Sequence, residues 1–114
     1  MIDNDITFAN IRTLSGLIKD KEISPVELIS IFLEKIEKLN PVLSAFITIA
    51  NESAYSDAQQ AEKAIMTGDY KGMLHGIPIA LKDNIFTDGV LTTAATPGLK
   101  EYIPNYGIFF VFYP

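Results

Sequence analysis

The residues of this chain that could do chemistry are grouped around one lysine. Lys82 follows a short apolar run, Ile77 to Leu81, and is itself followed by Asp83 and Asn84. A lysine at the end of a buried strand either pairs with a carboxylate or has its pKa lowered, because burial disfavours the charged form. In the second case the neutral amine can act as a general base. From the residue types alone, an ion pair with a nearby carboxylate is the commoner arrangement.

Other kinds of reactive site find little support in the sequence. His75 is the only histidine and there is no cysteine, so neither a histidine pair nor a thiolate set for a metal is present. A single histidine beside Gly76 is more often a structural hydrogen-bonding residue than a catalytic one. We therefore expect no metal and no cofactor, and Lys82 is the one candidate catalytic residue.

The apolar run and its lysine belong to a longer segment that resembles the amidase signature family. This segment is Leu74–Ile85 (LHGIPIALKDNI), and Gly89 and the segment Leu91–Thr96 (LTTAAT) follow it in the family's order. The N-terminal part is also similar to the helical lead-in of these enzymes, notably at Glu22–Leu28 (EISPVEL). The resemblance covers roughly residues 8 to 105.

This resemblance implies a Ser–cisSer–Lys triad in which Lys82 is the lysine. In such enzymes the neutral lysine takes a proton from the bridging serine, which in turn activates the nucleophilic serine. The nucleophile attacks the carbonyl of a small-molecule amide while backbone N–H groups stabilise the oxyanion, and water then hydrolyses the acyl-enzyme. The resemblance thus implies hydrolysis of a carbon–nitrogen bond.

The sequence departs from the family pattern where the two serines are expected. They should come from a serine- and glycine-rich segment well downstream of Lys82, but Ser56 is the last serine and only 32 residues follow Lys82. We therefore expect a truncated amidase-family protein that is inactive as these 114 residues. The alternative is a non-catalytic interaction module that docks on a larger partner through its apolar surface.

The last segment also departs from the family. Gly107–Pro114 (GIFFVFYP) is apolar and uncharged, which is more typical of a reading-frame slip or an early stop than of an evolved C-terminus; a genuine edge strand is the alternative. We accordingly divide the chain into residues 1–106, the N-terminal part of an amidase-signature domain, and residues 107–114, a divergent apolar tail.

Composition limits the partners and the compartment. With 48% hydrophobic and 20% charged residues the chain is not intrinsically disordered, and no apolar stretch is long enough to span a membrane. A net charge of -5 argues against nucleic-acid binding. The absence of cysteine and of a signal-like N-terminus favours the cytoplasm. A mean hydropathy of +0.22 is high for a small domain, so self-association through exposed apolar strands is expected.

The first part of the chain is predicted to be helical. Apolar residues at helical spacing indicate a helix over about residues 8–19. A second helix begins with the capping-box segment Ser24–Glu27 (SPVE) and is expected to stop at Asn40-Pro41. An alanine-rich helix is predicted over about residues 52–66, with Gly68 as its C-terminal cap.

Strands are expected in two places. The segment Leu43–Ile49 (LSAFITI) fits a buried strand or an extended link, and the run Ile77–Leu81 fits an edge strand, because Pro78 cannot donate to a central ladder. The predicted fold class is therefore α/β: N-terminal helices plus one or two strands. By resemblance these would form a partial piece of the mixed-sheet fold of the amidase signature family.

Overall fold

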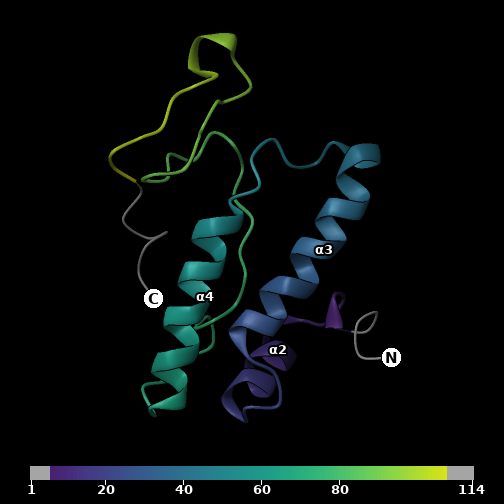
Figure 1. Cartoon of the computed structure of the whole chain (residues 1–114), viewed down its shortest axis with the longest axis vertical. Helices are drawn as coiled ribbons and strands as arrows, with labels where there is room; N and C mark the ends of the chain where they lie inside the picture. The colour runs from purple at the N-terminus through teal and green to yellow at the C-terminus, as the bar shows by residue number, and fades with distance from the viewer. Residues whose placement is uncertain (1–5, 108–114) are drawn as a thin grey trace. The chain divides into compact units, whose positions relative to one another are not determined.

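The computed structural model describes residues 6–107, which divide into two compact units (Figure 1). The first unit comprises the chain up to Ser44 together with Asn51–Pro78, and its described residues include the α-helices α2, α3 and α4. The second comprises Ala45–Ala50 and the chain from Ile79 onward, and it contains Lys82.

The first helix of the helical unit, α2, spans Ile11–Lys19 and begins later than its apolar spacing predicts. Its start is fixed by Asn10, whose side-chain oxygen accepts a hydrogen bond from the Thr13 backbone N–H at 2.9 Å. A side-chain cap of this kind satisfies one of the free N–H groups of the first turn. The cap therefore decides the boundary.

Helix α3 spans Pro25–Leu43 and begins with the predicted capping box. The Glu27 N–H donates to Ser24 Oγ at 3.1 Å, and the Ser24 N–H donates to the Glu27 carboxylate at 2.8 Å. The predicted stop at Asn40-Pro41 is wrong, because α3 runs through Pro41. A proline removes one N–H bond to the carbonyl four residues earlier, and α3 tolerates this loss two residues before its end at Leu43.

Helix α4 spans Asn51–Met66, as its alanine spacing predicts. Beyond it Gly68 has a φ of +90°, the left-handed conformation expected of a C-terminal cap. The Gly68 N–H donates to the Ile65 carbonyl and the Asp69 N–H donates to the Ala64 carbonyl, at 3.1 and 2.8 Å. This pair of bonds is the Schellman motif, which closes the helix.

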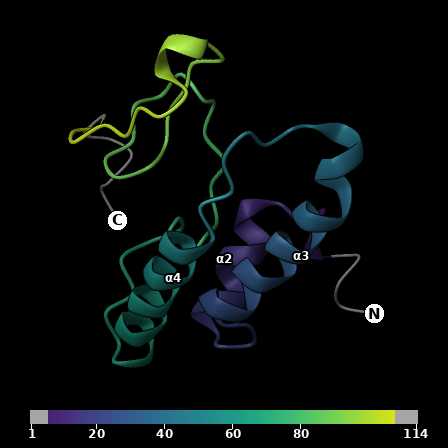
Figure 2. The ribbon, with the colours of Figure 1, turned by 45° about the horizontal axis from the view of Figure 1, so that its top comes forward.

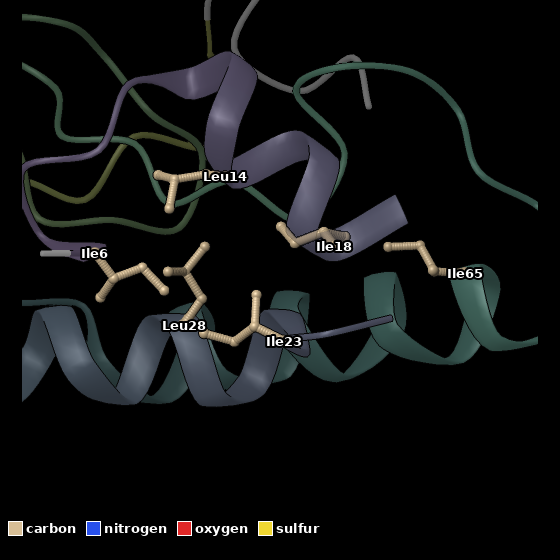
Figure 3. Close-up of a cluster of buried hydrophobic side chains, with 6 residues drawn as sticks. All are labelled: Ile6, Leu14, Ile18, Ile23, Leu28 and Ile65. Atoms are coloured by element: carbon tan, nitrogen blue, oxygen red, sulfur yellow. The ribbon is translucent and has the colours of Figure 1, made fainter. Parts of the chain in front are cut away.

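The helical unit is held together by one apolar cluster. Figures 1 and 2 show α3 and α4 packed side by side, and the cluster lies between them and α2 (Figure 3). Leu28 of α3 is fully buried, at 0% exposure, and Ile18 of α2 is nearly so. The buried members of the cluster are Ile6, Leu14, Ile18, Ile23, Leu28 and Ile65.

Gly76 closes the helical unit where the chain passes the start of α3. Its φ is +81°, and a Cβ atom placed there would lie 2.7 Å from Pro25 Cγ. We expect Gly76→Ala to lower the free energy of unfolding by more than about 1 kcal/mol, because both the backbone conformation and the contact oppose a side chain. Urea unfolding followed by circular dichroism measures this change.

The matched control for Gly76→Ala is Gly16→Ala. Gly16 lies inside α2, and a methyl group added to it would meet no atom within 4 Å. The same substitution should therefore stabilise α2 slightly, since alanine has the higher helix propensity. Equal effects of the two substitutions would contradict the close contact at Pro25.

The α/β fold class predicted from the sequence is wrong for the part of the chain that the structure describes. Residues 6–107 contain helices and turns but no strand, so neither the Leu43–Ile49 segment nor the Ile77–Leu81 run is a strand. A strand exists only where a neighbouring segment pairs with it in a backbone ladder, and residues 6–107 contain no such ladder. The N-terminal helices were predicted correctly, and the mixed sheet is not observed.

The second unit is a set of turns with its own aromatic packing. The Phe86 ring lies 5.5 Å from the Tyr102 ring and 5.9 Å from the Tyr106 ring, centroid to centroid. The Thr92 N–H donates to the Tyr102 carbonyl at 3.0 Å. A short 3-10 helix, η1, spans Pro97–Leu99. These contacts fix the loops around Lys82 without a sheet.

The division at residue 106, and the interpretation of residues 107–114 as a reading-frame slip, an early stop or an edge strand, remain predictions, because residues 108–114 lie outside the described residues. Within residues 6–107, none of the helices combines the length and apolar character needed to cross a membrane.

Candidate active site

Lys82 lies in a tight turn of the second unit. Its carbonyl oxygen accepts a hydrogen bond from the Ile85 N–H at 2.9 Å, and its side chain is exposed to solvent. Among residues 6–107 no carboxylate forms an ion pair with its amine. The ion pair that residue types alone favour is therefore not formed in the described part of the chain.

The carboxylate next to Lys82 is bound to a different segment. Asp83 Oδ1 accepts a hydrogen bond from the Thr93 N–H at 3.0 Å, and Asp83 Oδ2 accepts from the Thr93 hydroxyl and from the Ala95 N–H, the latter at 3.4 Å. The Asp83 backbone carbonyl also accepts from the Ala94 N–H at 2.9 Å. We call this set of bonds between Asp83 and residues 93–95 the Asp83 clasp.

The residues that the clasp holds have an unusual backbone. Ala94 and Ala95 have φ angles of +47° and +54°, in the left-handed region that non-glycine residues rarely occupy. Two consecutive residues of this kind persist only where surrounding contacts determine them. The four hydrogen bonds to Asp83 supply such contacts.

The clasp also sets the ionisation of its carboxylate. Hydrogen bonds from the Thr93 hydroxyl, and then from the Thr93 backbone N–H, hold the pKa of Asp83 below its ordinary value. Both bonds favour the charged carboxylate. The clasp is therefore fully formed above the ordinary aspartate pKa and weakens as the pH falls through the lowered one.

The comparisons with known proteins place this site within a family. The family model described as Amidase matches residues 27–111, which is most of the chain and includes the Lys82 turn. The chain belongs to the amidase family. The resemblance seen in the Lys82 segment is thereby confirmed.

The curated relatives of this amidase chain are much longer than it is. It is 43% identical over 102 residues to the A subunit of a glutamyl-tRNA(Gln) amidotransferase from Dehalococcoides mccartyi, covering 90% of this chain and 21% of the relative. The corresponding A subunits from Cyanothece sp. and Clostridium acetobutylicum are 42% and 35% identical, covering 86% and 90% of this chain. The chain spans about a fifth of the length of these relatives, 20 or 21% in each case.

Sequence reasoning about this amidase chain found Lys82 but missed the clasp. It gave Asp83 only as the residue after Lys82, and Thr93 only as part of the Leu91–Thr96 segment that follows in the family's order. Ten residues separate the two, so no helical or strand period links them. A usable signal is the pair of threonines Thr92-Thr93, since hydroxyl and backbone donors that follow a turn are ready partners for a carboxylate.

His75 lies in the helical unit of the amidase chain and has a structural contact. Its side chain is 7% exposed, and its Nδ1 atom accepts a hydrogen bond from the Lys71 N–H at 3.0 Å. Burial, and next the charge of Lys71, lower the pKa of His75 below its ordinary value, while Asp69 opposes them. The structural role expected from the sequence agrees with this contact.

This histidine should make the helical unit sensitive to mild acid. Because the folded pKa lies below the unfolded value of about 6.5, the unfolded chain takes up the proton first. The free energy of unfolding should therefore fall as the pH is lowered from about 7.5 toward 5.5. Urea titrations of the parent chain and of His75→Gln measure the effect, and equal slopes in the two proteins would contradict it.

Proposed function

We propose that this chain supplies the general-base lysine, Lys82, of an amidase that hydrolyses a carbon–nitrogen bond through a Ser–cisSer–Lys triad. The observation that carries the proposal is the state of Lys82 itself. It is exposed and without an ion pair in the described residues, in a turn held by hydrogen bonds, inside the segment that matches the family.

The proposed chemistry requires an amine that no carboxylate holds in its charged form. A lysine paired with a carboxylate is held in its charged form and is a poor base. Here the adjacent carboxylate, Asp83, is engaged by Thr93 and Ala95 instead. Asp83 therefore lies next to Lys82 in the sequence without forming an ion pair with its amine.

These 114 residues supply the lysine but not the serines of the proposed triad. No serine follows Ser56 in the sequence. Among the earlier serines, Ser24 caps α3, Ser30 donates to the Val26 carbonyl, and Ser15 is hydrogen-bonded to Tyr70. None of these is the serine- and glycine-rich segment that the proposed mechanism needs.

The names of the relatives suggest the setting of the whole protein. They are the A subunits of glutamyl-tRNA(Gln) amidotransferases. We infer that a complete protein with this chain would act on a small-molecule amide and work beside other subunits. The amide carbonyl would be attacked by the nucleophilic serine, with Lys82 receiving the proton through the bridging serine.

The proposal is tested by comparing two proteins. A polypeptide of residues 1–114 should hydrolyse simple aryl and aliphatic amides no faster than background, because Lys82 has no serine to activate. A hybrid in which the matching 102 residues of this chain replace those of the Dehalococcoides mccartyi relative should regain hydrolysis. A folded hybrid without activity, or Lys82-dependent turnover by the 114 residues alone, would contradict the proposal.

A second candidate function is docking without catalysis, and the end of α3 favours it. Leu39, Val42 and Leu43 are large apolar residues that lie exposed there, Val42 at 84%. Such residues could contact a larger partner. The self-association that the sequence also predicts would likewise use them and not strands, which the described residues lack. Sedimentation of residues 1–114 and of a Val42→Asp variant tests this surface. If the exposed end of α3 drives association, the variant should remain monomeric at concentrations where the parent chain associates; equal association of the two proteins would contradict it.

A further inference from the structure

We propose that Asp83 and Thr93 are the positioning residues of the Lys82 site, fixing through the Asp83 clasp the backbone from which the lysine side chain extends. This role rests on the proposed function of Lys82 as the general base. The structure places Asp83 one residue after Lys82, and Asp83 binds the 93–95 turn through both its carboxylate and its carbonyl.

The geometry leaves the Lys82 backbone little freedom. The Lys82 carbonyl is bonded to the Ile85 N–H in a tight turn. The next residue, Asp83, accepts four hydrogen bonds from a segment that is itself anchored, because the neighbouring Thr92 is 2% exposed and its N–H donates to the Tyr102 carbonyl. A catalytic group held on such a support keeps its direction, which is what effective proton transfer requires.

The clasp requires a carboxylate and not merely a polar side chain. All three groups that face the Asp83 side chain are donors: the Thr93 N–H, the Thr93 hydroxyl and the Ala95 N–H. A carboxylate accepts at both oxygens, whereas an asparagine amide would turn an NH₂ group toward at least one of these donors. Asp83→Asn should therefore open the clasp although the side chain keeps its size.

Thr93 allows the clasp to be tested without a change of charge. Its hydroxyl donates to Asp83 Oδ2 and accepts from the Ala95 N–H at 3.2 Å. Thr93→Val keeps the shape of the side chain and removes the hydroxyl, while Thr93→Ser keeps the hydroxyl. If the hydrogen bond holds the clasp, Thr93→Val should open it and Thr93→Ser should keep it closed. If packing holds it, Thr93→Val should leave it closed.

The first experiment is amide hydrogen exchange on residues 1–114. In Asp83→Asn and Thr93→Val the amides of Ala94 and Ala95 should exchange at least about 10-fold faster, while those of α3 stay unchanged. The control is Asp88→Asn, which removes the same charge from an exposed carboxylate in the same unit. Unchanged exchange in Asp83→Asn, or equal acceleration in Asp88→Asn, would overturn the clasp.

The second experiment measures activity in the hybrid protein. Asp83→Asn and Thr93→Val should lower kcat about 10-fold or more with little change in KM, and Thr93→Ser and Asp88→Asn should keep most of the parent activity. If Lys82→Ala abolishes turnover but Asp83→Asn does not reduce it, the positioning role is overturned and the proposed function stands. If the hybrid works without Lys82, the proposed function falls, and the positioning role falls with it.

Discussion

Replacing Lys82 with alanine in the hybrid protein should lower kcat for amide hydrolysis at least about 100-fold, the low end of what a general base contributes. The melting temperature should hardly change, because the Lys82 side chain is exposed and has no ion pair within the described residues. Steady-state kinetics and a thermal scan on the same preparations measure the two quantities.

Lys82→Arg is the informative companion to this substitution. Arginine keeps a positive charge at the position but does not lose its proton at accessible pH, so it cannot serve as the base. It should be as inactive as alanine. A variant that keeps its activity and loses several degrees of melting temperature would instead identify Lys82 as a structural residue.

Replacing Leu28 with alanine should have the largest effect on stability. Leu28 is fully buried among side chains from α2, α3 and α4, so truncating it leaves a cavity that these helices cannot easily close. Such substitutions cost about 2–5 kcal/mol, out of the roughly 5–15 kcal/mol by which small proteins are stable. We expect the helical signal of residues 1–114 in circular dichroism to fall sharply at 37 °C.

The control for the core substitution lies on the same helix. Val42→Ala shortens an apolar side chain that is 84% exposed, so it should change the free energy of unfolding by no more than about 0.5 kcal/mol. Comparable losses from Leu28→Ala and Val42→Ala would mean that the described core does not hold the helices together.

The helices of this chain were predictable because their signals are local. The capping box at Ser24 and Glu27 joins residues three apart, and both of its bonds are present in the structure. The Schellman bonds around Gly68 are equally short in range. The error at Pro41 has the same origin, since a local rule against proline considers the one N–H bond that proline removes and ignores the rest of the long helix α3, which ends two residues later at Leu43.

The strands could not be judged from the sequence in this way. An apolar run such as Ile77–Leu81 has the composition of a strand, but a strand exists only when another segment pairs with its backbone. In the described residues Ile77 packs against the helical core, while Ile79 is 76% exposed. Composition reports that a residue is apolar and does not report which neighbour covers it.

The candidate site was predictable in part for a related reason. Lys82 stood out through its position after an apolar run and through the resemblance of the segment around it. The backbone around Lys82 is held by the hydrogen bond between Asp83 and Thr93 and by two alanines with positive φ angles. Alanine rarely adopts a positive φ, so the sequence does not indicate this conformation at Ala94 and Ala95. Only the three-dimensional structure shows which donors a carboxylate meets.

The short separation of Asp83 and Thr93 along the chain has a consequence for the order in which the site is assembled. Closing a loop of about ten residues takes on the order of 10–100 ns and loses little chain entropy, whereas contacts between distant segments form later. The turn that carries Lys82 can therefore reach its final geometry early in folding, while a growing chain is still being synthesised. Segments that fold later can then pack against a Lys82 turn whose backbone is already in its final conformation.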